Sequence, residues 1–286
     1  MGVQIEKLHV KSILIRTSGY LDSVCSHSLQ PYRGCSYGRS LCGVGCYVQH
    51  NYFGTRGREW GTFLEAKGNA AEVYSRQFEA EKAWAQHTKG RFSIFMSSST
   101  DPFVSQERRF GITRQLLHAM LRQPPDVLIV QTHSHLVTAY LELYQKLAPR
   151  CDLRFHISIE SDRERLPGLP PPASSVAARF EAALQLKKAG LRVVITVAPI
   201  LPIADPDRFF GKIATVADAV VLDHFIEGDG SKSGSRTLKT ALPAAMQQVA
   251  AESVSLSYRR HVQRVAQKIM PGRVGIGMAG FAGHFQ

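Results

Sequence analysis

Short runs of apolar residues recur at regular intervals through the middle of the chain, and segments with helical spacing separate them. The runs begin near residues 92, 126, 153, 191 and 219, about 30 residues apart. That interval accommodates one strand, one helix and the loops between them. Most residues within each run are apolar and do not alternate with polar ones, as in strands covered on both faces. The pattern therefore predicts an α/β fold with a parallel sheet.

The apolar runs and the helical segments between them can be assigned to residue ranges. Several helical segments end at proline or glycine, which stop a helix. Ser174 or Ser175 is expected to cap the helix that begins at residue 176. The expected strands are 92–98, 126–132, 153–159, 191–198 and 219–222, and the expected helices are 111–122, 136–147, 176–189 and 207–216.

Composition limits the class of protein. The 286 residues are 44% hydrophobic, an ordinary value for a globular chain that can bury a sizeable core, and one domain spanning residues 1–286 is expected. The net charge of +12 favours an anionic partner such as nucleic acid, although dispersed cations also fit an ordinary basic surface. No apolar run reaches the ~20 residues of a membrane span, and the first residues do not resemble a secretory signal. A cytoplasmic protein without a membrane partner is expected.

Three of the five cysteines lie in one glycine-rich segment. Cys35, Cys42 and Cys46 are interspersed with glycines, which let a loop wrap closely around an object. An odd number of cysteines without an export signal argues against a disulfide framework. Thiolates that converge from one loop are typical ligands of a metal or an iron–sulfur cluster. The segment therefore predicts a metal-type site.

Other interpretations of the cysteines stay open at this point. A zinc site would need a fourth ligand, which His27 or His50 could supply. Cys25 and Cys151 lie outside the cluster and fit buried free thiols.

Polar residues follow every predicted strand. In parallel α/β folds the chemistry gathers at the carboxyl ends of the strands. The repetition across five strands therefore indicates a functional site at that edge of the sheet. The polar ends are residues 97–101 (SSSTD), 131–134 (QTHS), 158–161 (SIES), 198–199 (AP) and 223–224 (DH).

The cysteine segment and the later motifs together resemble a known family. Residues 27–35 (HSLQPYRGC), the two further cysteines and Tyr47 resemble the cluster loop of radical S-adenosylmethionine (SAM) enzymes. More narrowly, they resemble the branch that includes spore photoproduct lyase. The resemblance covers about residues 20–230 and leaves 231–286 as a C-terminal extension. The supporting motifs, in order, are residues 99–102 (STDP), 113–114 (TR), 156–160 (HISIE) and 197–202 (VAPILP).

The resemblance implies a fold, two cofactors and an activity. The implied fold is a partial (β/α)6 TIM-like barrel with parallel strands. Cys35, Cys42 and Cys46 would bind three irons of a [4Fe–4S] cluster, and the open fourth iron would bind SAM. Reductive cleavage of SAM would give a 5′-deoxyadenosyl radical that abstracts hydrogen from a substrate. A lyase or modifying enzyme with an electron donor of the flavodoxin or ferredoxin type is expected.

The resemblance also implies SAM contacts. Residues 99–101 would lie near the amino group, Ser134 and Ser158 near the carboxylate and ribose, and Tyr47 with residues 198–200 near the adenine. His133 departs from a lysine often found in this branch. The implied cofactor-binding residues are Tyr47, Ser99, Thr100, Asp101, His133, Ser134, Ser158, Glu160, Ala198, Pro199 and Ile200.

The cysteine spacing departs from the family pattern. Six residues separate the first two cysteines and three separate the last two, where the family has three and two. Extra glycines would let a longer loop close around the same cluster. The alternative is a zinc-binding or non-catalytic barrel protein with an altered cysteine loop. The tail, residues 270–286, is expected to be irregular, because its GxGxxG match lacks room for a dinucleotide-binding unit.

Overall fold

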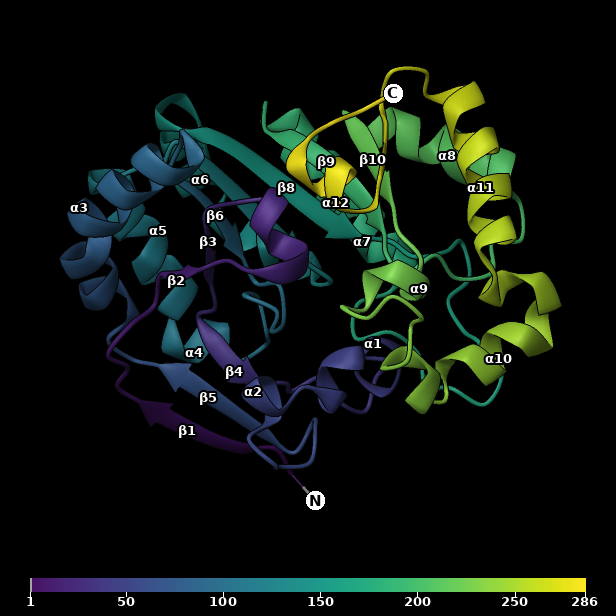
Figure 1. Cartoon of the computed structure of the whole chain (residues 1–286), viewed down its shortest axis with the longest axis horizontal. Helices are drawn as coiled ribbons and strands as arrows, with labels where there is room; N and C mark the ends of the chain where they lie inside the picture. The colour runs from purple at the N-terminus through teal and green to yellow at the C-terminus, as the bar shows by residue number, and fades with distance from the viewer. Residues whose placement is uncertain (1) are drawn as a thin grey trace.

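The computed structural model describes residues 2–286 and is built on an eight-stranded sheet (Figure 1). The strand order is β11-β10-β9-β8-β7-β6-β3-β2, and every neighbouring pair is parallel except β2 with β3. The expected α/β fold with a parallel sheet is confirmed. The strands are β2 (Ile15–Arg16), β3 (His27–Leu29), β6 (Ser93–Met96), β7 (Val127–Thr132), β8 (Asp152–Ser158), β9 (Arg192–Val197), β10 (Ala219–Leu222) and β11 (Val274–Ile276).

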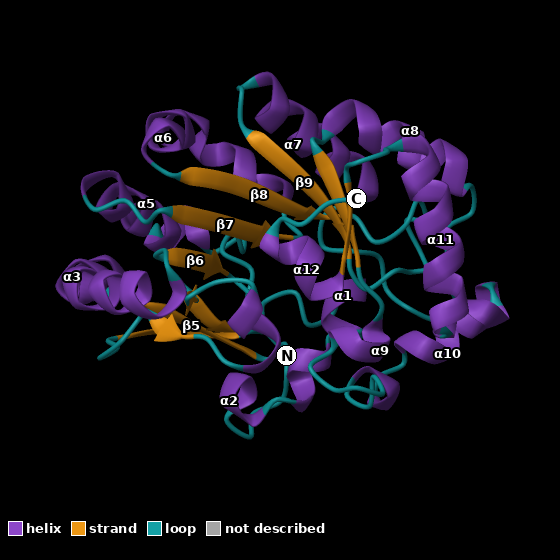
Figure 2. Ribbon diagram, turned by 45° about the horizontal axis from the view of Figure 1, so that its top comes forward, coloured by secondary structure: helices purple, strands orange, loops and turns teal. Residues whose placement is uncertain are grey.

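Six helices form an arc around one face of this sheet, as Figure 2 shows. Their apolar sides and the facing strand residues form the largest hydrophobic core. These helices are α3 (Ala70–Lys89), α5 (Ile112–Arg122), α6 (Leu141–Leu147), α7 (Val176–Lys188), α8 (Pro206–Val216) and α11 (Leu256–Ile269). The other α-helices are α1 (Leu41–Val44), α2 (Tyr52–Thr55), α4 (Glu107–Phe110), α9 (Phe225–Gly228), α10 (Leu242–Val249) and α12 (Gly277–Ala282). The 3-10 helices are η1 (Gly19–Ser23), η2 (Tyr47–His50), η3 (His135–Tyr140), η4 (Ala148–Arg150), η5 (Thr237–Lys239) and η6 (Ala251–Val254).

The predicted strands and helices from residue 92 to residue 222 are confirmed, with small shifts at their ends. The segment predicted as a helix over 136–147 begins as the 3-10 helix η3 and becomes α-helical only at Leu141. Ser175 is the cap of α7, and its hydroxyl accepts a hydrogen bond from the Ala178 amide at 3.1 Å. No helix within residues 2–286 is long and apolar enough to cross a membrane.

The C-terminal tail is not irregular, and that expectation is wrong. Residues 274–276 form β11 at the edge of the sheet, and α12 follows immediately. The close return of α12 needs glycine, because a Cβ on Gly275 would lie 2.5 Å from the Cα of Gly280. Phe281 of α12 packs on Phe95 and Tyr20 against the sheet face opposite the six helices.

A second sheet of three strands, which the sequence analysis did not assign, lies beside the first. Its order is β1-β5-β4, with β1 parallel and β4 antiparallel to β5. The strands are β1 (Gln4–Leu8), β4 (Tyr32–Gly34) and β5 (Phe63–Lys67). Because β4 leads directly into the cysteine segment, this sheet determines where that segment begins.

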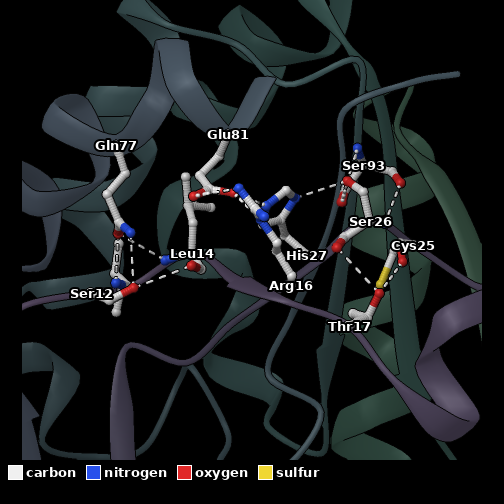
Figure 3. A network of polar contacts seen from close by, with 11 residues as sticks. Ser12, Leu14, Arg16, Thr17, Cys25, Ser26, His27, Gln77, Glu81 and Ser93 are labelled. Carbon is white, nitrogen blue, oxygen red and sulfur yellow. Dashed lines mark hydrogen bonds and ion pairs between the residues drawn. The ribbon is translucent and has the colours of Figure 1, made fainter. Parts of the chain in front are cut away.

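A network of polar contacts attaches the segment that contains β2 and β3 to helix α3 (Figure 3). Gln77 of α3 accepts hydrogen bonds from the Ile13 and Leu14 amides at 2.8 and 3.2 Å. The His27 ring contacts Ser26 Oγ at 3.0 Å through one nitrogen and Glu81 at 2.9 Å through the other. Both ring nitrogens are therefore engaged, and His27 is not a fourth ligand beside the cysteines.

Gly34, the last residue of β4, generates a stability prediction. Its φ is +82°, and a Cβ there would lie 2.4 Å from the carbonyl oxygen of Phe63. Gly90 has a similar φ of +77° but open space around it. We expect Gly90→Ala to cost about 1–2 kcal/mol, because only backbone strain is added. Gly34→Ala should cost about 3 kcal/mol or more, because the carbonyl must also move. Urea denaturation measures both, and equal costs would contradict the packing argument.

Candidate functional site

The cysteine loop begins at the end of β4 and is held against β5. The backbone N–H of Cys35 donates to the Phe63 carbonyl oxygen at 3.0 Å. Further along the loop, a Cβ on Gly38 would lie 2.1 Å from the Cα of Gly61. Two glycine backbones thus touch where no other residue fits. Cys35 is thereby fixed by the second sheet.

Cys42 lies on the short helix α1, which rests on the proline-rich segment 162–172. The Leu41 amide donates to the Pro171 carbonyl oxygen at 3.0 Å. Leu41 packs with Leu166, which is only 3% exposed. Leu166 therefore anchors this segment against α1.

The three thiols of the loop influence one another's charge. Burial raises the pKa of Cys42 to about 11 and that of Cys46 to about 12, and the Cys42 thiolate further raises the latter. Burial also raises the pKa of Cys35 well above its ordinary value, with further contributions from Cys42 and Cys46. Without a metal all three are neutral thiols near pH 7, so metal binding would release their protons.

The donor set fits an iron–sulfur cluster better than a single metal ion. No three histidine, cysteine, aspartate or glutamate side chains of residues 2–286 form a group that could hold one ion. The zinc alternative therefore has no preformed site within that range. A [4Fe–4S] cluster spaces its cysteines more widely, because each thiolate binds a different iron. Cys35 is buried, Cys42 and Cys46 are half-buried, and the charges of these thiols interact, which matches that requirement.

Asp101 joins the ends of β6 and β7 beside the thiols. Its carboxylate accepts hydrogen bonds from the Phe103 amide at 2.8 Å, the His133 amide at 2.7 Å and the Thr132 hydroxyl at 2.9 Å. Burial raises the pKa of Asp101, although these donors oppose the shift. Because its oxygens are occupied in this way, Asp101 positions two strand ends.

Several other predicted SAM contacts also hold the backbone in place. The Thr100 hydroxyl donates to the Gly34 carbonyl oxygen at 3.0 Å, which ties the end of β6 to β4. Ser134 accepts from the Leu136 amide at 3.2 Å and caps η3. The Ser99 hydroxyl forms no hydrogen bond within residues 2–286, although the Ser99 amide lies 3.4 Å from Gln30 Oε1.

Glu160 is the most strongly held charge in the site. One carboxylate oxygen lies 2.7 Å from Arg179 Nη1, and the other lies 3.1 Å from His133 Nε2. Burial alone would raise the pKa of Glu160, but Arg179 and His133 outweigh it and hold the pKa far below its usual range. Glu160 is therefore an anion at any physiological pH.

Arg179 was missed by the sequence analysis. It comes from α7, is 2% exposed, and also donates to the Ser158 carbonyl oxygen at 2.5 Å. A cation on the apolar face of a helix, one residue before the buried Phe180, was the signal that could have identified it.

A layer of polar side chains lines the face of the sheet opposite the six helices. Gln131 Nε2 donates to Ser158 Oγ at 2.6 Å and to Thr196 Oγ1 at 3.0 Å. Three buried atoms on the adjacent strands have no partner among residues 2–286: Ser97 Oγ, Gln131 Oε1 and His156 Nδ1. Gln131 and His156 are register partners, and Ser97 has a strained φ of +75° at the end of β6. Each unpaired buried polar group lowers the stability of the fold by about 1–3 kcal/mol. This layer is therefore a candidate binding site for the polar groups of a ligand.

The remaining predicted contacts are half-buried or buried. Tyr47 is half-buried, and burial first and then the charges of Cys46 and Asp223 raise its pKa. Ala198 and Pro199 are half-buried at the end of β9. Ile200 is fully buried in the main core, so its side chain packs there.

Asp223, at the end of β10, is a second buried carboxyl group. It accepts a hydrogen bond from the Tyr20 hydroxyl at 2.7 Å and from the His224 amide at 3.0 Å. Burial raises the pKa of Asp223 to about 6, and Tyr20 and Arg259 only partly oppose this. The sequence analysis noted the position as a polar strand end but assigned it no role.

Comparison with known proteins identifies the architecture. A variant of spore photoproduct lyase with bound dinucleoside spore photoproduct superimposes with a TM-score of 0.61 over 96% of this chain and 80% of that chain, at 15% identity. A second variant of that enzyme also gives 0.61, over 96% and 81%, at 14% identity. The chain has the fold of spore photoproduct lyase. The resemblance to that branch of the radical SAM enzymes is thus confirmed at the level of the fold.

Sequence comparison provides less information about the family than the structural comparison does. No family model matches the chain. An uncharacterized protein of Acidianus two-tailed virus, ORF301, is 32% identical over 151 residues. This match covers 51% of the chain and 44% of the viral protein, so the chain spans less than half of that relative.

The Glu160–Arg179 pair gives a second prediction. Arg179→Met leaves a buried anion with His133 alone, so we expect a loss of about 3–5 kcal/mol in unfolding free energy. The double variant Glu160→Gln with Arg179→Met should recover part of the lost unfolding free energy. Lys187→Met, on the same helix but in the exposed pair with Asp218, should change stability by less than about 1 kcal/mol. Denaturant titration of the four proteins tests this, and equal losses for the two single variants would contradict it.

Asp223 gives a pH prediction. Its pKa is about 6 in the folded protein against 3.8 ordinarily, so ionisation is less favourable in the folded state. Stability should therefore fall, relative to Asp223→Asn, as pH rises from about 4 to about 7, by on the order of 3 kcal/mol. Below pH 4 the stabilities of the wild type and Asp223→Asn should change with pH in the same way. Melting temperatures across this range test the point, and a constant difference would refute it.

Proposed function

We propose that the protein is a radical SAM enzyme whose cluster ligands are Cys35, Cys42 and Cys46. The supporting observation is that one buried and two half-buried thiols, whose charges interact, lie beside the polar strand ends of a sheet with the spore photoproduct lyase fold. The charges of Glu160 and Arg179 both affect the pKa of Cys42, which links the cysteine loop to the ends of β8 and α7.

A bound [4Fe–4S] cluster would supply the electron for reductive cleavage of SAM to a 5′-deoxyadenosyl radical that abstracts hydrogen from the substrate. An electron donor of the flavodoxin or ferredoxin type would be required. The protein's own residues would bind and orient SAM and exclude water from the site.

The roles proposed for individual residues follow from their contacts. Glu160, kept anionic by Arg179, would accept hydrogen bonds from ligand hydroxyl groups such as those of ribose. His133 would contact the same carboxylate through its Nε2 atom. Ser99 is half-buried and its hydroxyl forms no hydrogen bond to residues 2–286, so it would be a direct polar contact to SAM. Asp101 would act indirectly, by fixing the strand ends around the ligand.

The unpaired polar layer supports a ligand on the same face of the sheet. Ser97, Gln131 and His156 carry three polar atoms that a bound molecule or its waters would satisfy. We infer that Tyr47, Ala198 and Pro199 border this ligand, since each is half-buried near the strand ends.

The substrate class and the remaining details are further parts of the proposal. The lyase structure contains a dinucleoside photoproduct, and this chain has a net charge of +12, so a nucleic-acid substrate is proposed. We also propose that the sheet forms a partial (β/α)6 barrel in a single domain, residues 1–286, and that the protein acts in the cytoplasm. The alternative, a zinc-binding or non-catalytic protein, is favoured only by the longer cysteine spacing.

A matched pair of cysteine variants tests this function. We expect the anaerobically reconstituted protein to contain about four irons and four sulfides. Its reduced EPR signal should shift on addition of SAM, and it should form 5′-deoxyadenosine. Cys42→Ala should abolish the product, because an iron loses its ligand, whereas Cys25→Ala, at a buried thiol outside the loop, should retain it. Zinc without sulfide, or a cluster that does not respond to SAM, would establish the alternative.

A further inference from the structure

The outward face of β5 carries a concentrated group of charges that the proposed chemistry does not use. Phe63, Glu65 and Lys67 share this face, because alternate residues of a strand point the same way. Arg33 of β4 lies level with Glu65 in the strand register. The Arg58 guanidinium lies 3.7 Å from the centre of the Phe63 ring. We call Arg33, Arg58, Glu65 and Lys67 the β5 face.

Positive charge exceeds negative charge here. Glu65 forms ion pairs with both Arg33 and Arg58. No carboxylate of residues 2–286 forms an ion pair with Lys67. Burial, followed by the charges of Arg33 and Arg56, lowers the pKa of Lys67 to about 8.

A further carboxylate, on the neighbouring strand β1, does not remove this excess. Glu6 of β1 is level with Glu65, but it is exposed and accepts a hydrogen bond from its neighbour Gln4. Two carboxylates therefore face the four cations Arg33, Arg56, Arg58 and Lys67. An added anion would relieve the repulsion that Lys67 experiences.

The chemistry of the cations indicates which anion. Arginine guanidinium groups bind phosphate oxygens in pairs, and lysine adds a point charge. Helix α2, which packs beside β4, presents Tyr52 and Phe53 with 72% and 88% of their surfaces exposed. Exposed aromatic rings beside cations are the arrangement with which proteins stack bases while holding the phosphates.

We propose that the β5 face binds a phosphate group through Arg33, Arg58 and Lys67, and that Tyr52 and Phe53 contact the rest of the same ligand. The phosphate could belong to a nucleic-acid strand or to a small phosphorylated molecule. The suggestion that this ligand is the substrate rests on the proposed function. Its physical basis is that only Gly34 separates Arg33 from Cys35, so a ligand held here lies beside the cysteine loop.

Two charge-matched double variants test the site in the full-length protein. Arg56→Gln with Lys67→Gln removes the lysine of the β5 face and the arginine whose charge acts on it, without breaking either ion pair to Glu65. Arg260→Gln with Arg264→Gln removes two exposed charges from α11, away from this face. The probes are a labelled single-stranded oligonucleotide, followed by anisotropy at several salt concentrations, and inorganic phosphate, followed by calorimetry.

For a nucleic-acid ligand, the first double variant should weaken oligonucleotide binding at least tenfold and reduce the salt slope by about 0.7 for the lost Lys67 contact, while the α11 variant should bind nearly as the wild type does. For a small phosphorylated ligand, saturable phosphate binding should be lost in the first variant alone, without oligonucleotide binding. Equal weakening by both variants would show a general charge effect and overturn the proposal. Binding only to phosphatidylserine vesicles, with no response to either probe, would also overturn it.

The binding test of the β5 face and the test of the proposed function can fail independently of each other. The binding measurements need neither SAM nor reductant, and Cys42→Ala should bind both probes as the wild type does. Loss of 5′-deoxyadenosine formation with intact binding would affect only the proposed function. Intact SAM cleavage with no phosphate-dependent binding would affect only the β5 face.

Discussion

The cysteine loop can lie against the second sheet because glycine backbones touch at points where a side chain would collide. A Cβ on Gly34 would meet the Phe63 carbonyl, and one on Gly38 would meet Gly61. The same contacts let the Cys35 amide reach the Phe63 carbonyl oxygen and so fix the first cysteine. β5 thus has two roles, since one end supports the cysteine loop and its outward face carries the excess of positive charge.

The polar residues at the strand ends divide into two groups by what their side chains contact. Thr100 and Ser134 form hydrogen bonds with backbone groups, and Asp101 accepts from two backbone amides and the Thr132 hydroxyl, so these residues determine the shape of the site more than its chemistry. Glu160 differs, because a buried carboxylate is tolerated only with a buried partner, and Arg179 provides it from a separate helix. The charged part of the site therefore depends on the packing of α7 against β8.

Most strands of the main sheet and the helices between them could be predicted from the sequence, whereas the second sheet could not. Continuous apolar strands such as Val127–Thr132 and Ala219–Leu222 were predicted because burial on both faces leaves a local pattern. β1, β4 and β5 were not predicted, because they form a separate sheet that depends on pairing between distant segments. Most predicted site residues lie at strand ends as expected. Arg179, Tyr20 and the partners of Asp223 could not be assigned, because their roles arise from contacts between segments far apart in the chain.

The unusual cysteine spacing has a structural account that bears on the chemistry. The added residues are absorbed by a compact turn, in which a Cβ on Gly43 would lie 2.1 Å from the Tyr37 carbonyl oxygen, and by the single turn of α1. Neither moves the thiols out of electrostatic reach of one another, because Cys35 still responds to both Cys42 and Cys46. Whether three cysteines can serve one cluster depends on where their sulfurs lie, not on how many residues separate them. The longer loop therefore keeps the three thiols close enough for their charges to interact, and Gly43 permits its compact turn.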